Sequence, residues 1–409
     1  MTSVQNHLLP LSGSKYWLIL CAGLFLAGCS PKVRPGTTKK PESTQKDKIV
    51  DKPSEKLTEA NIALLMPFRL NEINLKTATK ADVERSAMAI DFYQGFKLGI
   101  DSAAAKGMNF KVRVYDTRDS NDQLASLVEN GSLASSQLIV GPVFPESIKY
   151  LGNYTKAKHI PMVSPLAATH PNEFSNPNLI SLVNNIDLHA AKIGSYVTGN
   201  YNPANTVVVL ISTKSSSDEM LAAPLRRYFS NSKRQFVLQE YASVYSMETK
   251  MRKDKQYVVM VVSSDRKFVV PTLDRLVKIK NKGFKLQLFG HPDWIKQNYN
   301  TDKLQTLATS VTSSYKVDYK SAAVVGFIRR YRAKYRFEPG EYAFKGFDAG
   351  LYFGQLLAKH GRDYLNFLTR DEYKGLHNNF SFEKDDQLGY INTSLMLLQY
   401  KDFALNVIE

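Results

Sequence analysis

The N-terminal part of the sequence lacks an apolar run long enough to span a bilayer. Its apolar run, residues 16–27, has about a dozen residues, whereas a membrane-spanning helix needs about 20. Lys15 provides a positive flank just before this run. The pattern therefore predicts the core of a signal peptide rather than a membrane helix.

Cysteine is nearly absent, since Cys21 and Cys29 are the only two in 409 residues. The stretch Leu26-Ala27-Gly28-Cys29 looks like a bacterial lipobox, in which a peptidase cleaves before a lipidated cysteine. This predicts a signal peptide over residues 1–28, removed together with Cys21, and lipidation of Cys29. No thiol would then remain for a disulfide, a metal site or a nucleophile. The alternative is an ordinary signal sequence with a cysteine there by chance.

The segment after this cysteine has few apolar residues and many Lys, Pro, Ser and Thr. Residues 29–58 therefore predict a disordered tether, because they cannot bury enough surface to fold. Acyl chains on Cys29 would hold the protein in the cell envelope, at a membrane surface facing the periplasm. Ser30 directly after the cysteine favours the outer membrane by the enterobacterial sorting rule.

Motifs of common enzyme classes are also missing. The sequence has no Gly-x-Ser-x-Gly elbow and no Walker loop, and its seven histidines show no pair at metal-ligand spacing. Asp116 and Asp119 form an acidic pair, for which helix capping together with Asp122 is the favoured interpretation. We therefore expect no catalytic residues, no metal and no cofactor, and a protein that is not an enzyme.

Positive charge is in excess, with a formal net charge of +16. Residues 59–409 hold 45 Lys or Arg against 34 Asp or Glu, which is still +11. This excess fits attraction to anionic cell-wall polymers or lipid headgroups, or a solvated basic surface without a dedicated partner. Nucleic acid is not expected, because export would separate the chain from it and no reader motif is present. The densest basic run, residues 327–336, predicts a helix with one apolar and one basic face.

After the tether, short β-rich runs alternate with helical patterns, as expected for parallel βαβ units. The same alternation begins again near residue 186, without a visible tandem repeat. The fold class predicted is α/β, with two doubly wound lobes that each have a parallel sheet. In the first half, strands are predicted over 61–66, 110–115, 137–141 and 160–164, and helices over 86–105, 121–133 and 145–157. In the second half, strands are predicted over 206–211, 236–241, 256–262 and 284–289, and helices over 187–199, 217–230 and 268–282.

Ligands of open α/β sheets bind beyond the carboxyl ends of the strands, and small, polar and aromatic residues gather at those ends here. Each of them alone also fits a turn or a helix cap. From this location the candidates for ligand binding are Phe68, Asp116, Ser164, Ser263, Asp265 and Asp293.

Several segments in their order and spacing resemble the type I periplasmic binding proteins, the group of the leucine/isoleucine/valine-binding proteins. The resemblance runs from about residue 60 to the C-terminus and includes a Phe/Tyr-rich helix followed by a turn at Gly346-Phe347-Asp348. It is carried by residues 62–67, 93–95, 139–142, 160–165 and 346–349, and by residues 380–402, which look like a closing hairpin of the family.

The resemblance implies two lobes joined by a three-crossing hinge, with crossings near residues 185, 314 and 391. Lobe one would comprise residues 59–185 and 314–390, and lobe two residues 186–313 and 391–409. Ligand would bind between the lobes and hold them closed. Carried over by position, the further ligand-binding candidates are Phe144, Pro145, Ala168, Thr169 and Tyr342.

Two departures from the family pattern bear on the ligand. Pro145 stands where amino-acid binders usually place a Ser for the ligand carboxylate, and the stretch 164–169 is one residue longer than usual. Both features disfavour a free α-amino acid. The resemblance therefore implies a protein that captures a small polar ligand for an ABC permease or a sensor. A rival interpretation is an outer-membrane lipoprotein that activates a peptidoglycan synthase, because activators of penicillin-binding proteins also resemble this fold, including Gly141-Pro142 and Ser164-Pro165-Leu166.

Overall fold

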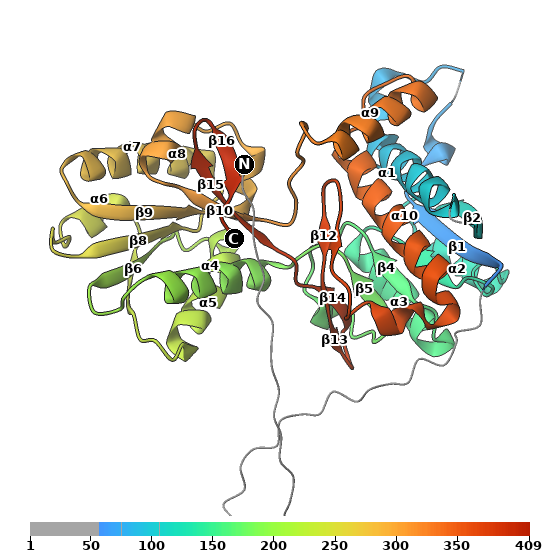
Figure 1. Ribbon diagram of the computed structural model, residues 1–409, viewed down its shortest axis with the longest axis horizontal. Helices are drawn as coiled ribbons and strands as arrows, with labels where there is room; N and C mark the ends of the chain where they lie inside the picture. The colour runs from blue at the N-terminus through green and yellow to red at the C-terminus, as the bar shows by residue number, and fades with distance from the viewer. Residues whose placement is uncertain (1–56, 75, 106) are drawn as a thin grey trace, which may run out of the picture. The chain divides into compact units, whose positions relative to one another are not determined.

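The computed structural model describes residues 57–74, 76–105 and 107–409. The predicted signal peptide, the lipidation site Cys29 and almost all of the tether lie outside these residues. Within the described ranges, no helix combines the length and the apolar character needed to cross a membrane. Most described residues belong to two α/β lobes, each built on a seven-stranded sheet (Figure 1). The predicted fold class is thus confirmed.

The sheet of lobe one has the strand order β13-β14-β5-β4-β3-β1-β2. All its pairs are parallel except the edge pair β13–β14. Buried Ile, Leu, Met and Val residues dominate its central strands, as expected for a sheet covered on both faces. Its strands are β1 (Glu59–Met66), β2 (Asn109–Asp116), β3 (Leu138–Val140), β4 (Met162–Ser164), β5 (Leu179–Ser181), β13 (Phe382–Asp385) and β14 (Gly389–Asn392).

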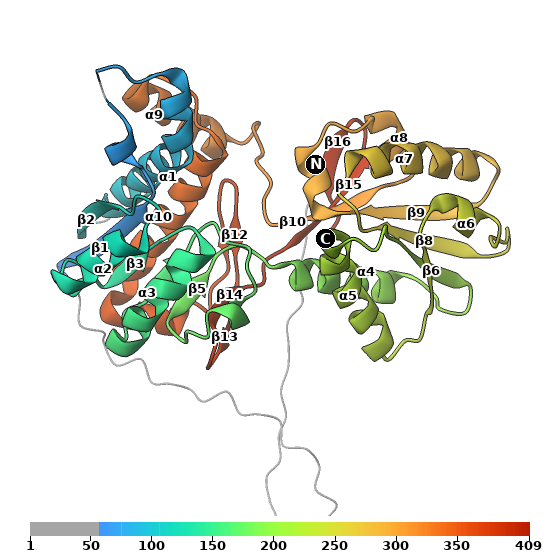
Figure 2. The same cartoon turned by 180° about the vertical axis from the view of Figure 1, so that it is seen from behind.

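Helices cover both faces of this sheet. α1 (Lys80–Ala104) and α10 (Glu341–His360) pack against each other and on one face, where Ile62 and Leu64 point. α2 (Asn121–Glu129) and α3 (Pro145–Lys158) cover the opposite face (Figure 2). The remaining elements of this lobe are η1 (Leu70–Glu72), η2 (Pro171–Glu173), α9 (Ala322–Tyr335), η4 (Gly361–Phe367), β11 (Tyr373–Lys374) and β12 (Asn379–Phe380).

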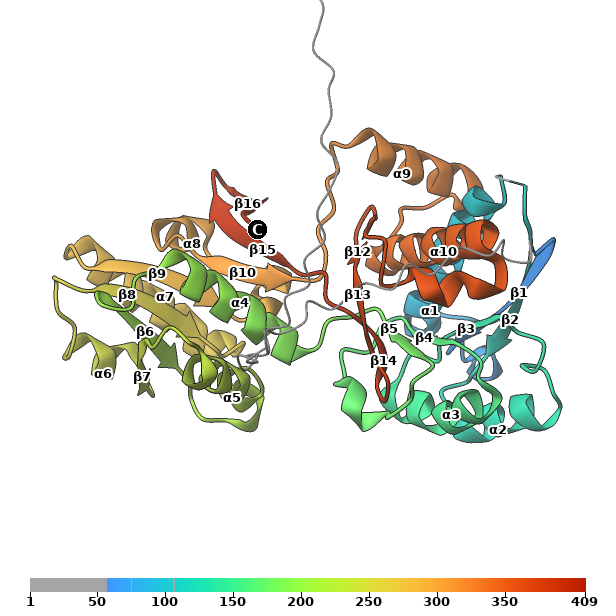
Figure 3. The ribbon, with the colours of Figure 1, turned by 60° about the horizontal axis from the view of Figure 1, so that its bottom comes forward.

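The sheet of lobe two has the strand order β16-β15-β10-β9-β8-β6-β7. The central pairs are parallel, and the pairs β10–β15 and β15–β16 at one edge are antiparallel (Figure 3). Its strands are β6 (Thr206–Ile211), β7 (Val237–Tyr241), β8 (Gln256–Val261), β9 (Lys285–Gly290), β10 (Ser310–Ser313), β15 (Met396–Lys401) and β16 (Ala404–Val407). Its helices are α4 (Ile186–Asn200), α5 (Ser216–Asn231), α6 (Val244–Glu248), α7 (Arg266–Asn281), η3 (Pro292–Lys296) and α8 (Thr301–Thr306).

The strand alternation places two separate cores on this sheet. Val208 and Leu210 of β6 pack with α4 and α5, whereas Val207 and Val209 of the same strand pack with α7. This follows from the period of two along a strand, which turns successive side chains to opposite faces. Lobe two is therefore covered on both faces, as lobe one is.

The chain passes from one sheet to the other between β5 and α4, after β10, and between β14 and β15. Strand pairing alone does not delimit the lobes, so the predicted domain limits stay a prediction. Two local predictions are wrong. The segment Gly346–Asp348 is not a turn but part of α10, and residues 380–402 do not form one hairpin. Instead β13 and β14 pair in the first sheet, while β15 and β16 pair in the second.

Helix α9 carries the densest basic run. Phe327 and Tyr331 are fully buried, and the Tyr331 hydroxyl donates to Asp91 Oδ1 at 3.1 Å and Gln94 Oε1 at 2.6 Å. On the other face, Arg332 pairs with Glu338, and Lys334 with Asp101. The predicted two-faced helix is thus present, and much of its charge is used within the chain.

Candidate functional site

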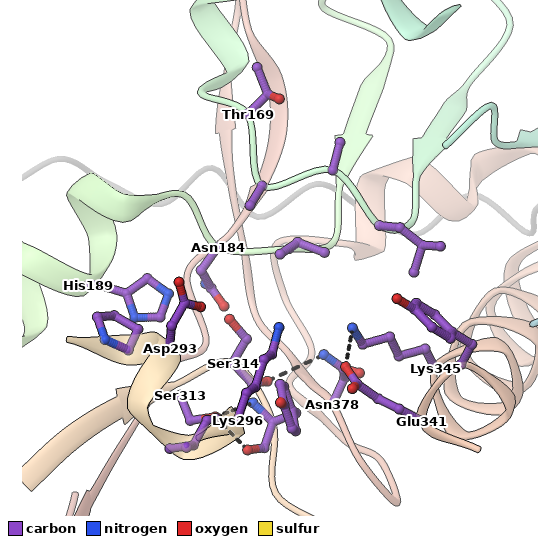
Figure 4. A pocket seen from close by; sticks show the side chains of 18 of the residues that line it. Thr169, Asn184, His189, Asp293, Lys296, Ser313, Ser314, Glu341, Lys345 and Asn378 are labelled. Atoms are coloured by element: carbon purple, nitrogen blue, oxygen red, sulfur yellow. Dashed lines mark hydrogen bonds and ion pairs between the residues drawn. The ribbon is translucent and has the colours of Figure 1, made fainter. Parts of the chain in front are cut away.

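A cavity of about 420 Å³ lies among segments that belong to both sheets, within the size range of small-molecule sites (Figure 4). Lobe one contributes the loops after β3 and β4 and the first turns of α10. Lobe two contributes α4, η3 and the end of β10. Its lining includes Phe144, Pro145, Ala168, Thr169, Asn184, His189, Asp293, Lys296, Thr312, Ser313, Ser314, Tyr315, Glu341, Tyr342, Lys345 and Asn378.

The loop after β3 leads directly into α3. Phe144 is the N-cap residue in extended conformation, and Pro145 is the first residue of the helix. Proline fits this position because its φ is already helical, but it has no N–H to offer a ligand. Phe144 is 37% exposed, so an apolar ring rather than a donor faces the cavity from this loop.

The first turns of α10 supply the charged groups of lobe one. Glu341 and Lys345 lie at i and i+4, and Lys345 Nζ is 2.7 Å from Glu341 Oε1. The same ammonium lies 5.4 Å from the ring centres of Tyr315 and Tyr342. Burial lowers the pKa of Lys345. Burial also opposes ionisation of Glu341, yet attraction to Lys345 and their hydrogen bond hold the pKa of Glu341 below its usual value.

Helix η3 supplies the charged groups of lobe two, and Trp294 anchors it. The Trp294 indole is fully buried, and its Nε1 donates to the carbonyl oxygen of Ser263 at 2.9 Å. The indole also lies against Gly290, where a Cβ would come within 2.2 Å of the ring. Because Trp294 points into the core, its neighbours Asp293 and Lys296 are left exposed and line the cavity.

Neutral hydrogen-bonding groups near the crossing between β5 and α4 and at the end of β10 complete the lining. His189 Nδ1 lies 2.8 Å from Thr312 Oγ1, and burial lowers the pKa of His189 to about 3, so its imidazole is neutral at pH 7. Asn184 donates from Nδ2 to the carbonyl oxygen of Asn392 at 2.7 Å. Its Oδ1 is buried and accepts no hydrogen bond from any residue that the structure describes. A ligand with a hydroxyl or N–H group could satisfy this oxygen.

A buried carboxylate organises the floor of the cavity. Asp348 accepts the backbone N–H groups of Leu376, His377 and Asn378, each at 2.8 Å. Burial is the main reason why its pKa is raised to about 6. The loop held in this way reaches the crossing after β10, because Asn378 Nδ2 donates to the Ser314 carbonyl oxygen at 3.3 Å. The crossing segment is thus tied to α10 through Asp348.

Six of the eleven predicted ligand-binding residues line this cavity: Phe144, Pro145, Ala168, Thr169, Asp293 and Tyr342. The other five do not line it. Phe68 packs edge-on against Tyr93, and Asp116 accepts the N–H groups of Arg69, Leu70 and Arg118. A role in ligand binding stays a prediction for all eleven residues.

The other three are buried or serve as caps. Ser164 is buried, the Ser263 hydroxyl accepts the N–H of Asp265, and Asp265 caps α7 by accepting the N–H of Lys267 at 3.0 Å. None of these three side chains belongs to the lining of the cavity.

Four residues of the lining were not predicted from the strand ends: Glu341, Lys345, His189 and Lys296. Glu341 and Lys345 have the i, i+4 spacing of a helical ion pair, which would have been a usable signal. Because Gly346–Asp348 was interpreted as a turn, the helical spacing of Glu341 and Lys345 was not recognised. His189 and Asn184 carry no sequence signal of their own, because only the packing of α4 beside β10 brings them to the cavity.

Comparison with known proteins agrees with this geometry. A family profile described as Periplasmic binding protein matches residues 84–371, well over half of the chain. The chain belongs to the periplasmic binding protein family. This membership confirms the family resemblance and supports a location in the periplasm or cell envelope. Proteins of this family bind small solutes and work with ABC transporters. A search of curated proteins finds no match.

Solved structures at low sequence identity to this chain have the same fold. A Rhodospirillum rubrum protein described as a branched-chain amino acid ABC transporter is 15% identical, with a TM-score of 0.64, over 86% of this chain and 100% of its own. An ABC transporter substrate-binding protein from Desulfitobacterium hafniense is 15% identical, with a TM-score of 0.54 and the same coverages. LpoA from Haemophilus influenzae is 14% identical, with a TM-score of 0.55, over 87% of this chain and 60% of its own. At these identities the likeness shows the fold alone.

Proposed function

We propose that this chain is a lipid-anchored solute-binding protein of the periplasm that captures a small polar ligand in the cavity and delivers it to an ABC transporter or a sensor. The observation that carries the proposal is the cavity itself. It has room for a small molecule, and each lobe contributes hydrogen-bonding and charged side chains to its lining. A ligand that contacts both lobes stabilises the form in which they are closed.

The anchor is part of the same proposal. Lipidation of Cys29, with Ser30 favouring the outer membrane, would keep the binding lobes at a membrane surface facing the periplasm. The tether would let them reach a membrane partner. Mass spectrometry of the N-terminal peptide tests this step: an acylated Cys29 as first residue supports it, and an unmodified chain that begins elsewhere refutes it.

Capture is tested by thermal-shift screening of the protein extracted in detergent against a broad metabolite library. A ligand at about 100 times its dissociation constant adds about 2.7 kcal/mol to the stability of the folded state. We expect one chemical class to give saturable stabilisation. Ala168→Trp, at an exposed position in the cavity lining, should abolish it by filling the cavity. Ala134→Trp, at an exposed position outside the lining, is the matched control and should not change it.

The rival function is activation of a peptidoglycan synthase through protein–protein contacts. Pro145 favours it, because this residue offers neither a hydroxyl nor an N–H at a place where the cavity would need a donor. Retention of the protein on an immobilised peptidoglycan synthase is the direct test. If the Ala168→Trp variant is still retained on the synthase and no metabolite stabilises the protein, the function is activation of the synthase and not capture.

A further inference from the structure

We propose that the captured solute is a small organic acid with hydroxyl or N–H groups, and that Lys296 is the residue that selects its anionic group. The inference rests on the proposed capture function and specifies its ligand class. It draws on the unbalanced charge of Lys296, on the position of Lys345 opposite it, and on the unpartnered oxygen of Asn184.

Lys296 is the second lysine of the lining, besides Lys345. It is exposed, and no described residue forms an ion pair or a hydrogen bond with its ammonium group. Figure 4 shows its side chain extending from η3 into the cavity, toward the region where Lys345 extends from α10. The two lysines come from different lobes, so an anion between them would be held from both sides.

The neighbouring charges favour an anion at this end of the cavity. Glu341 is engaged by Lys345 at 2.7 Å, so this pair is neutral as a unit. Lys296 also attracts Glu341, so these three groups together carry one excess positive charge, and the repulsion from Lys296 adds to the effect of burial in lowering the pKa of Lys345. An anionic group near both ammonium groups would relieve this repulsion.

The other acid of the lining, Asp293, lies apart from this pair. Figure 4 places it beside His189. Its carboxylate is 3.6 Å from Nδ1 of His291, and its side chain is 56% exposed. Burial lowers the pKa of His291, although Asp293 opposes this shift. The cavity therefore has a cationic end and an end with acceptors.

At the end of the cavity with acceptors, the ligand would need hydrogen-bond donors. Asn184 Oδ1 is buried and accepts no hydrogen bond within the described part of the chain, and an unsatisfied buried acceptor costs stability. Asn184 is only 2% exposed, and its other amide atom is fixed by the carbonyl of Asn392. A ligand hydroxyl or N–H would supply the missing donor. Together the two ends describe an acid whose remaining groups donate hydrogen bonds.

The test uses matched pairs of ligands. Gluconate and gluconamide, lactate and lactamide, and N-acetylalanine and its amide are compared by thermal shift and calorimetry on the protein extracted in detergent. We expect acids to bind and their neutral amides not to bind. For the acids that bind, Lys296→Gln should weaken affinity about 10- to 100-fold, the range of a hydrogen bond to a charged group. Lys285→Gln, at an exposed lysine of β9 outside the cavity, should leave affinity unchanged.

Each other outcome has a definite meaning. The inference is refuted if an amide binds as tightly as its acid, or if Lys296→Gln does not change the affinity for an acid. Neither result refutes capture. If the library screen above finds only neutral or cationic ligands, the inference also fails while capture stands. Absence of saturable binding by any library or panel compound refutes capture, and the inference falls with it. Lys296→Gln should keep the unfolding midpoint of the unmodified protein, which excludes misfolding as the cause of lost affinity.

Discussion

Substitution of one glycine in α10 should show whether close helix packing or helix propensity has the larger effect on stability. At Gly346 an added Cβ would lie 2.1 Å from the carbonyl oxygen of Phe92 in α1. The neighbouring contacts are equally close, since a Cβ at Gly95 would lie 1.8 Å from the Ala343 oxygen and one at Gly350 2.4 Å from the Phe96 oxygen. The two helices therefore meet backbone to backbone, and neither can shift locally to make room.

The expected magnitude follows from two opposing terms. In Gly346→Ala the helices must separate by about 1 Å to restore an ordinary contact distance, and overpacking of this kind costs about 1–3 kcal/mol or more. The gain in helix propensity is only about 0.5–1 kcal/mol. The difference is a net loss of about 0–2.5 kcal/mol or more, whereas the propensity term alone would give a gain. Because Gly346 follows Lys345 directly, ligand affinity should fall as well.

The matched control is Gly326→Ala in α9, where a Cβ would have nothing within 4 Å. Only the propensity term acts there, so this variant should gain about 0.5–1 kcal/mol. Urea denaturation followed by far-ultraviolet circular dichroism measures both variants against the unmodified protein. If Gly346→Ala is as stable as Gly326→Ala, the close packing of α1 against α10 is refuted.

Two further predictions concern groups around the cavity. The pKa of His189 is about 3 in the folded protein and about 6.5 in the unfolded chain. The unfolded chain therefore binds one more proton below pH 6.5. The free energy of unfolding should fall by about 2 kcal/mol between pH 7 and pH 5 for this reason. In urea denaturation, His189→Gln should remove that part of the pH dependence. His159→Gln, at an exposed position, is the control and should not remove it. If stability depends on pH in the same way for His189→Gln and the unmodified protein, the imidazole of His189 is not buried and neutral. Trp294→Phe should lower stability by about 2–4 kcal/mol, because it leaves the Ser263 carbonyl without its donor and opens a void beside Gly290. It should also weaken ligand binding through displacement of η3, and unchanged affinity and stability would show that the indole does not anchor this helix.

Much of the fold could be predicted from local patterns. The runs of residues 206–211 and 256–261 are β-branched and apolar, and both are buried strands of the second sheet. The course of α10 could not be predicted in this way. The family resemblance suggested a turn at Gly346-Phe347-Asp348, yet Gly346 and Gly350 lie within the helix and permit the close approach of α1. That requirement exists only once both helices are in place.

The residues of the candidate site also fall into two groups, those that the sequence predicted and those whose position depends on helix packing. Phe144 and Thr169 lie in the loops after β3 and β4, neighbouring parallel strands of one sheet, and Asp293 lies in η3, just after β9 of the other sheet. The position of strand ends predicted Asp293, and the family resemblance predicted Phe144 and Thr169. Lys345 and His189 reach the cavity from helices, and their position depends on how each helix packs. The family resemblance suggested that the C-terminal strands form one hairpin over residues 380–402. Only pairing with β5 and β10 distinguishes them.

The combination of Pro145 with two cavity lysines changes how a ligand would close this protein. Pro145 removes one N–H from the start of α3, and Lys345 is the cationic side chain that lobe one contributes to the cavity. Lys296 gives lobe two a cation as well. Lys296 would repel the Lys345 ammonium but attract the Glu341 carboxylate paired with it, so this end of the empty cavity carries a single excess positive charge. An anionic ligand would balance that charge from between the lobes, so a bound acid would favour the closed form.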